Sequence, residues 1–161
     1  MLARFLANQP QAMRRDVVRL FRPDLLPQMA PWGPSWRALC EELALPCPEL
    51  VVALGDAMAD VFLYFAIDDH TYAMLTPEEA RHEHAFLNTM AASYPYLLAP
   101  AAMLPVFGED GDLLLIAADG RVHALGHDEW NRCEVVAGSL TELLDRAVEG
   151  SLNPPAPDGA A

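Results

Sequence analysis

The chain contains no lysine, so all ten of its basic residues are arginine, and 23 acidic residues outnumber them. The formal net charge at pH 7 is −13. This excess argues against binding to nucleic acid or to anionic membranes, because both need a basic protein surface. An acidic chain instead suits a basic protein partner, and the same charge also keeps a protein in solution. Composition alone leaves both interpretations open.

Cysteine and long hydrophobic runs are also scarce. The three cysteines form no C-x-x-C pair, which favours buried thiols over a disulfide framework or a zinc site. The longest apolar runs, such as VFLYFAI at 61–67, are far shorter than the roughly 18 residues of a membrane-spanning helix. The first residues reach polar side chains and Pro10 too soon for the apolar core of a secretory signal. We therefore predict a cytoplasmic protein that does not enter a membrane.

Sequence signatures of catalysis are missing as well. We find no G-x-S-x-G nucleophile motif and no glycine-rich phosphate loop. His82 and His84 lie two positions apart in a predicted helix, so they point about 160° away from each other and could not easily share one metal ion. We predict no catalytic, cofactor-binding or metal-binding residues. A small metal-dependent enzyme that uses His70, His82, Glu83 or His84 remains an alternative hypothesis.

Three acids, Glu109, Asp110 and Asp112, lie within four positions of the chain. A calcium loop of the EF-hand type needs oxygen ligands at alternating positions over about twelve residues. Leucine and isoleucine occupy 113–116, so that ligand pattern fails. A carboxylate pair for acid–base chemistry stays open, since sequence adjacency neither shows nor excludes it. We interpret the segment as a polar loop that leads into a buried strand.

The length of 161 residues and a hydrophobic content of 53% predict one domain with a core of its own. We predict an α+β fold over residues 1–150, in which an antiparallel sheet of about 4–6 strands is flanked by helices. Residues 1–55 are expected to be mainly helical, and residues 60–150 to form the sheet and further helices. The proline-rich residues 151–161 are expected to be a disordered tail.

Helical periodicity is clear in the N-terminal third. The proline-dense segment after Arg22 is expected to lack regular structure. Helices are predicted at 9–22, 35–45 and 48–54. The inward face of the first is predicted to carry Met13, Val17, Leu20 and Phe21.

Turn and capping signals organise the remainder. Thr76-Pro77-Glu78-Glu79 and Ser139-Leu140-Thr141-Glu142 are capping boxes, which predict helix starts. Asp119-Gly120 tolerates the positive φ of a hairpin turn, while Gly150 is a suitable helix stop. The predicted helices are 76–92 and 140–150, and the predicted strands are 60–67, 71–75, 112–117, 121–125 and 134–137.

Several short motifs occur in a characteristic order. TPEEA at 76–80 follows a predicted strand pair; LPVF at 104–107, GDLL at 111–114 and DGRVH at 119–123 come next; AGSLTELL at 137–144 closes the series. In this order the chain resembles the SUKH superfamily over roughly residues 60–150, and His127-Asp128 matches a pair that is frequent in that superfamily. Two features depart from its pattern, because 57–60 holds no N-G-G-like turn and Leu140 stands where an aromatic residue is usual. The GAD-like group, with a similar hairpin and last helix, remains an alternative.

The resemblance implies a binding module that needs no chemistry. Many bacterial SUKH members look like immunity proteins, which neutralise a toxin by covering its active site or another surface it needs. We therefore hypothesise that the protein binds a cognate toxin with a basic surface in the cytosol. A non-catalytic adaptor or chaperone for a secreted effector is the alternative, and the sequence does not indicate the oligomeric state. The candidate partner-binding residues are Asp68, Asp69, Glu109, Asp110, Asp112, Asp128, Glu129 and Trp130.

Overall fold

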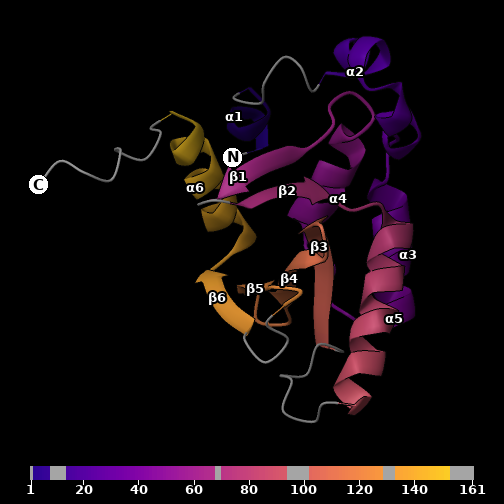
Figure 1. Ribbon diagram of the computed structural model, residues 1–161, viewed down its shortest axis with the longest axis vertical. Helices are drawn as coiled ribbons and strands as arrows, with labels where there is room; N and C mark the ends of the chain where they lie inside the picture. The colour runs from indigo at the N-terminus through magenta and orange to yellow at the C-terminus, as the bar shows by residue number, and fades with distance from the viewer. Residues whose placement is uncertain (1, 8–13, 68–69, 94–101, 129–132, 153–161) are drawn as a thin grey trace, which may run out of the picture.

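The computed structural model describes residues 2–7, 14–67, 70–93, 102–128 and 133–152 (Figure 1). These residues form a six-stranded antiparallel sheet and seven helices, one of them a 3₁₀ helix, in a single domain. The predicted α+β class and the helical N-terminal third are confirmed. The helices are α1 Leu2–Ala7, α2 Arg15–Phe21, η2 Pro23–Gln28, α3 Gly33–Leu43, α4 Glu49–Ala57, α5 Pro77–Ser93 and α6 Leu140–Leu152. The strands are β1 Tyr64–Ile67, β2 His70–Met74, β3 Met103–Glu109, β4 Asp112–Ala117, β5 Val122–Leu125 and β6 Cys133–Ala137.

The strands lie in the sheet in the same order as in the chain, and each runs antiparallel to its neighbour. Each strand therefore reverses the direction of the one before it. As a result, the β1–β2, β3–β4 and β5–β6 connections all lie at one end of the sheet. This topology positions the candidate site, because the predicted acidic segments border these three connections.

Two Asp-Gly turns shape the central strands. Asp110 and Gly111 have φ angles of 47° and 92°, and they connect β3 to β4 through the paired residues Glu109 and Asp112. Positive φ at both positions is the pattern of a two-residue type I′ turn. In the β4–β5 connection, Gly120 has a φ of 87°. The Asp119-Gly120 hairpin turn predicted from the sequence is thus confirmed.

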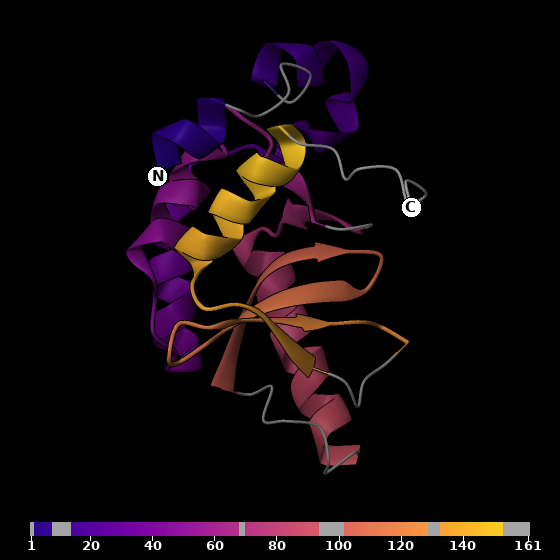
Figure 2. The same ribbon diagram turned by 90° about the vertical axis from the view of Figure 1, so that its left-hand side faces the viewer.

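Helices cover both faces of the sheet (Figure 2). On one face, α1 and α6 pack near β1, and the ring of Phe5 meets that of Phe65 edge-on at 6.1 Å between centroids. The sequence spacing of the apolar residues Leu140, Leu143, Leu144, Ala147 and Val148 predicts one inward face for α6, and this face is buried. On the other face, α5 lies against β3, and Leu87 packs with Leu113 and Leu115. Among the described residues, no helix combines the length and the apolar character that a membrane span requires.

The start of α5 confirms one capping box. The backbone N–H of Glu79 donates to Thr76 Oγ1 at 3.2 Å, and the backbone N–H of Thr76 donates to Glu79 Oε2 at 2.7 Å. At α6, Ser139 Oγ likewise accepts from the backbone N–H of Glu142 at 3.1 Å. Here Glu142 reaches back to the N–H of Gly138, at 2.8 Å, rather than to that of the capping serine. The helix then continues past the predicted stop at Gly150 to Leu152.

The predicted inward face of the first helix is wrong where the structure describes it. Leu20 and Phe21 are 76% and 75% exposed, whereas Val18 is buried. The cause is Arg15, whose Nη1 donates to the carbonyls of Met29 at 2.8 Å and Ala59 at 2.9 Å. Arg15 and Val18 lie three positions apart on one helix face, so anchoring the arginine turns that face inward. Leu20 and Phe21 consequently point outward.

One segment expected to lack regular structure has it, and one strand was not predicted. Residues Pro23–Gln28, in the proline-dense linker, form the 3₁₀ helix η2, and Pro23 lies at its first position, where a helix needs no N–H. Residues Met103–Glu109 form β3, an unpredicted strand that pairs on both sides. Pro105 argues against a strand at this place in the sequence, because proline lacks the backbone N–H that a strand inside a sheet donates to its neighbour. A register shift between Pro105 and Phe107 accommodates the proline.

Candidate functional site

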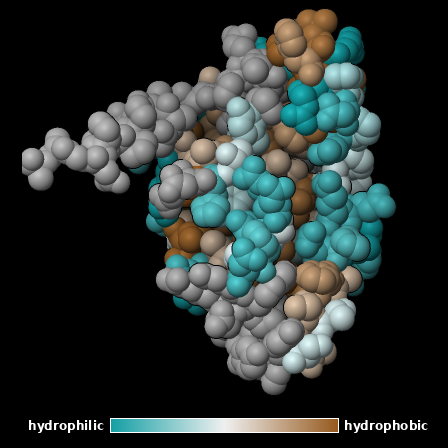
Figure 3. Space-filling view, viewed as in Figure 1, coloured by the Kyte–Doolittle hydropathy of each residue, from teal (hydrophilic) through white to brown (hydrophobic). Residues whose placement is uncertain are grey.

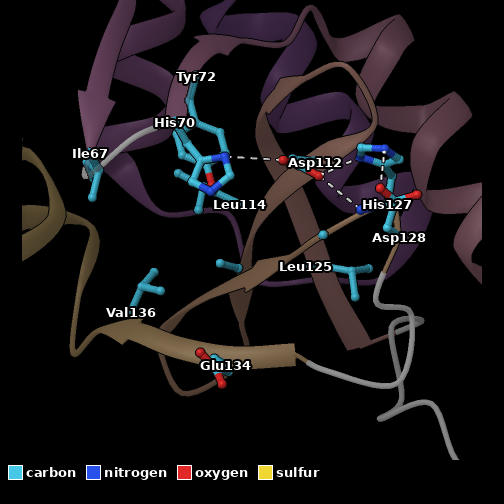
Figure 4. Close-up of a pocket in the computed structure, with 12 residues that line it drawn as sticks. Ile67, His70, Tyr72, Asp112, Leu114, Leu125, His127, Asp128, Glu134 and Val136 are labelled. Atoms are coloured by element: carbon cyan, nitrogen blue, oxygen red, sulfur yellow. Dashed lines mark hydrogen bonds and ion pairs between the residues drawn. The ribbon is translucent and has the colours of Figure 1, made fainter.

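A hollow of about 490 Å³ opens in the sheet between the start of β2 and the edge strand β6 (Figure 4). Its floor is apolar and comes from β1, β2, β4, β5 and β6. The floor residues are Ile67, Tyr72, Leu114, Ala124 and Val136. Tyr72 and Leu114 are almost fully buried, so the floor continues the protein core. A concave, mostly apolar surface with a few converging polar groups is the usual form of a binding site.

Asp112 is the centre of the polar rim. Its Oδ1 accepts hydrogen bonds from the backbone N–H of His127 at 2.9 Å and from the Nδ1 of its ring at 2.8 Å. Its Oδ2 lies 3.3 Å from Nδ1 of His70. One carboxylate therefore joins the start of β2 to the end of β5, and Figure 4 shows all three side chains on the same side of the hollow. Burial acts to raise the pKa of Asp112, but the hydrogen bonds from His127 outweigh it, and the pKa is lowered.

His127 lies between two carboxylates. Its Nδ1 faces Asp112, and its Nε2 lies 3.1 Å from Oδ2 of Asp128. A neutral imidazole carries one N–H, so it can donate to only one of these acids, whereas the protonated ring donates to both. The hydrogen bond with Asp112, followed by the charges of Asp128 and Asp110, raises the pKa of His127. The carboxylates of the rim therefore stabilise a positive charge, which here is that of the protonated His127 ring.

The β3–β4 hairpin fixes these acids in position. Glu109 Oε2 accepts a hydrogen bond from the backbone N–H of Thr71 at 2.9 Å, which holds the hairpin against β2. A Cβ atom added at Gly111 would lie 2.9 Å from Cβ of His127, so the turn passes too close to that residue for any larger side chain. The polar loop predicted at 109–112 is a tight hairpin turn at Asp110 and Gly111, which packs against His127, and it leads into the buried strand β4 as predicted.

The structure brings several predicted partner-binding residues together. Glu109, Asp110 and Asp112 lie in or beside the β3–β4 turn, and Asp128 follows β5 at the same end of the sheet. Asp112 and Asp128 line the hollow, whereas Glu109 lines a second, smaller hollow of about 350 Å³. The other predicted candidates, Asp68, Asp69, Glu129 and Trp130, lie outside the described residues.

The histidines separate into different environments. His82 is exposed and His84 is buried on α5, where Nδ1 of His84 lies 3.3 Å from Nδ2 of Asn88. Within the described ranges, no three His, Cys, Asp or Glu side chains are placed to hold a metal ion. His123 is buried, and neither of its ring nitrogens has a hydrogen-bond partner in the described structure. Burial lowers the pKa of His123, and the charge of Arg121 adds to this effect.

A second surface feature lies on α2, beside the smaller hollow. Figure 3 shows hydrophobic surface at the top of the view, where α2 carries the exposed Leu20 and Phe21. The smaller hollow, lined partly by Arg22 and Leu25, adjoins this helix. Adjacent exposed apolar side chains of this size are typical of contact sites between proteins. This pair is a contact candidate in addition to the acidic rim.

Sequence reasoning missed the rim partners of Asp112. It placed His70 only in the metal-enzyme alternative and His127 only in the His-Asp pair of the resemblance, whereas the fold places both beside one carboxylate. A signal was present, because a meander brings alternate turns together and His70, Asp112 and His127 all border such turns. Glu134, which lines the hollow from β6, carried no signal of this kind.

Comparison with known proteins identifies no relative, since no protein-family model, curated protein or solved structure matches the chain.

Proposed function

We propose that the protein is a SUKH-like immunity protein, which binds a basic toxin in the cytosol and neutralises it by covering a surface the toxin needs. The observation that carries this proposal is the acidic rim of the hollow, where Asp112 and Asp128 flank a histidine above an apolar floor. The rim is held by strand ends and a tight turn. A binding surface that is already ordered loses less entropy on association.

Charge and sequence support the same proposal. A chain with a net charge of −13 repels nucleic acid and attracts cationic proteins. The segments that resemble the SUKH superfamily include the β3–β4 turn, the β4–β5 turn and the start of α6. The first borders the hollow, and the other two belong to the connections of the sheet that forms it. A toxin that acts on nucleotides or nucleic acid has a cationic substrate site, which an acidic rim complements.

The test is co-expression with the toxin domain encoded by the neighbouring reading frame in the source genome. A stable complex and protection of the host cell are expected. The double variant Asp110→Asn/Asp128→Asn removes two rim charges and retains side chains that tolerate these turns. It is expected to slow association roughly tenfold at low salt, because rim charges act mainly on the association rate. The matched control is Glu41→Gln/Glu78→Gln, which removes the same charge from α3 and α5.

The outcomes separate the alternatives. A complex that forms without protecting the cell would replace neutralisation by an adaptor or chaperone role. If both double variants associate at the wild-type rate, and Leu20→Ser/Phe21→Ser abolishes the complex, the partner binds the α2 end and the acidic-rim assignment is wrong. Absence of any complex with the neighbouring product would refute the immunity function.

A further inference from the structure

We propose that the hollow receives an arginine side chain of the partner, with its aliphatic stem over the apolar floor and its guanidinium at Oδ2 of Asp112, where the charge of Asp128 adds to the attraction. This inference rests on the proposed function for the identity of the partner as a basic protein. The recognition chemistry itself follows from the lining of the hollow, and it is testable without the partner.

The shape of the hollow favours a long basic side chain. A floor of leucine, valine and tyrosine offers contact to methylene groups, while the carboxylates stand at the rim rather than at the bottom. Arginine and lysine match this division, since both have an apolar stem and a charged end. Arginine matches it better, because its planar guanidinium donates to two acceptors at once and is less strongly hydrated than an ammonium group.

The carboxylates of Asp112 and Asp128 attract a cation, and their contacts with His70 and His127 leave them able to accept further hydrogen bonds. Asp112 is 20% exposed, and its contact with His70 is the longer of its two histidine contacts, at 3.3 Å against 2.8 Å for the His127 ring. Asp128 is 87% exposed. No arginine is among the described residues that line the hollow. A guanidinium can therefore take the place of His70 at Asp112 and leave His127 in position.

Binding of this kind depends on pH through His127. Asp112 and Asp110 face it from β4 and the turn, Asp128 follows it in the chain, and His70 lies across Asp112. A protonated His127 offsets the charge of these acids, so it weakens the attraction for an incoming guanidinium. Affinity for arginine is expected to rise as the pH increases through the pKa of His127. The dissociation constant should fall roughly three- to tenfold between pH 5.5 and pH 8.

The experiment is an NMR titration of the isotope-labelled full chain with Nα-acetyl-arginine amide. The matched probe is the citrulline compound, which has nearly the same shape without the charge. Arginine amide is expected to shift the methyl signals of Ile67, Leu114 and Val136 and the ring signals of His127, with a dissociation constant of roughly 1–10 mM. Lysine amide is expected to bind more weakly, and citrulline amide to cause no saturable shift.

Variants distinguish the site from a general charge effect. Asp112→Asn removes the charged acceptor and should weaken arginine binding at least about threefold, and the exposed change Asp128→Asn removes a nearby charge and should weaken it by a smaller factor. Asp119→Asn, which removes the same charge at the β4–β5 turn, should leave it unchanged. Equal shifts with citrulline, or binding that survives both rim variants, would overturn the arginine site while leaving the immunity function to its own test. Conversely, arginine binding without any toxin complex would retain the site and remove the function.

Discussion

The two Asp-Gly turns give a matched pair of substitutions that measures how tightly the β3–β4 hairpin is packed. Gly111 and Gly120 have similar φ angles, 92° and 87°, so alanine is strained by a similar amount at both positions. That strain is about 1–2 kcal/mol, partly offset by the lower entropy of the unfolded chain. An added Cβ at Gly120 meets no atom within 4 Å, whereas at Gly111 it would lie 2.9 Å from Cβ of His127.

Gly120→Ala should therefore reduce the free energy of unfolding by about 1 kcal/mol. Gly111→Ala carries a further overpacking cost of about 1–3 kcal/mol, which gives a total of about 2–4 kcal/mol. The contact also pushes His127 away from Asp112, so the raised pKa of His127 should return toward its ordinary value of about 6.5 in Gly111→Ala alone.

Urea unfolding measures the first quantity, and NMR titration of the histidine ring measures the second. Unchanged m-values would show that neither variant changes the surface exposed on unfolding, so that a shift of the urea midpoint measures a change in stability. Equal losses of stability in the two variants, together with a wild-type pKa for His127 in Gly111→Ala, would refute the close packing of the turn against His127.

Three further predictions concern stability. Thr76→Ala removes the cap of α5 and should lower the free energy of unfolding by about 1 kcal/mol in urea titrations, whereas Thr89→Ala, inside the same helix, should have a smaller effect. Leu143→Ala opens a cavity under α6 and should cost about 2–5 kcal/mol, against less than about 1 kcal/mol for the exposed Val135→Ala. His123 and His127 should change the free energy of unfolding in opposite directions with pH. The pKa of His123 is lowered in the folded state, so the protein loses stability as the pH falls below about 6.5. The pKa of His127 is raised in the folded state, so the protein loses stability as the pH rises above about 6.5. His123→Leu and His127→Ala should therefore change the slope of stability against pH in opposite directions, and a shared direction would contradict the assigned environments.

Local signals predicted those elements that local forces determine. The capping box of Thr76 and Glu79 and the Asp119-Gly120 turn each involve neighbouring residues, so the sequence contains all the groups that interact. The apolar spacing along α6 also predicted its buried face, because a single helix packs on a single surface. The fold class followed from the order of these elements.

Errors arose where distant residues decide the structure. The orientation of α2 depends on Arg15 reaching the carbonyls of Met29 and Ala59, which no periodicity can show. The strand β3 depends on a register shift that admits Pro105. The acids at 109–112 were identified as candidates, but their histidine partners come from β2 and the end of β5. A pattern read along the chain does not contain the sheet topology that brings those residues together.

The position of α6 has a consequence for how the protein folds. Neighbouring strands are adjacent in the chain, so the sheet can form by successive closure of short loops, with α5 in the one longer connection. In contrast, α6 follows the last strand yet packs against the first, and Asp145 lies 3.6 Å from Arg4. During synthesis, α1 can already pack on Phe65, but the part of the β1 face that α6 covers stays exposed until α6 has left the ribosome. Docking of α6 is a late, long-range step, so weakening its stripe should accelerate unfolding more than it slows folding.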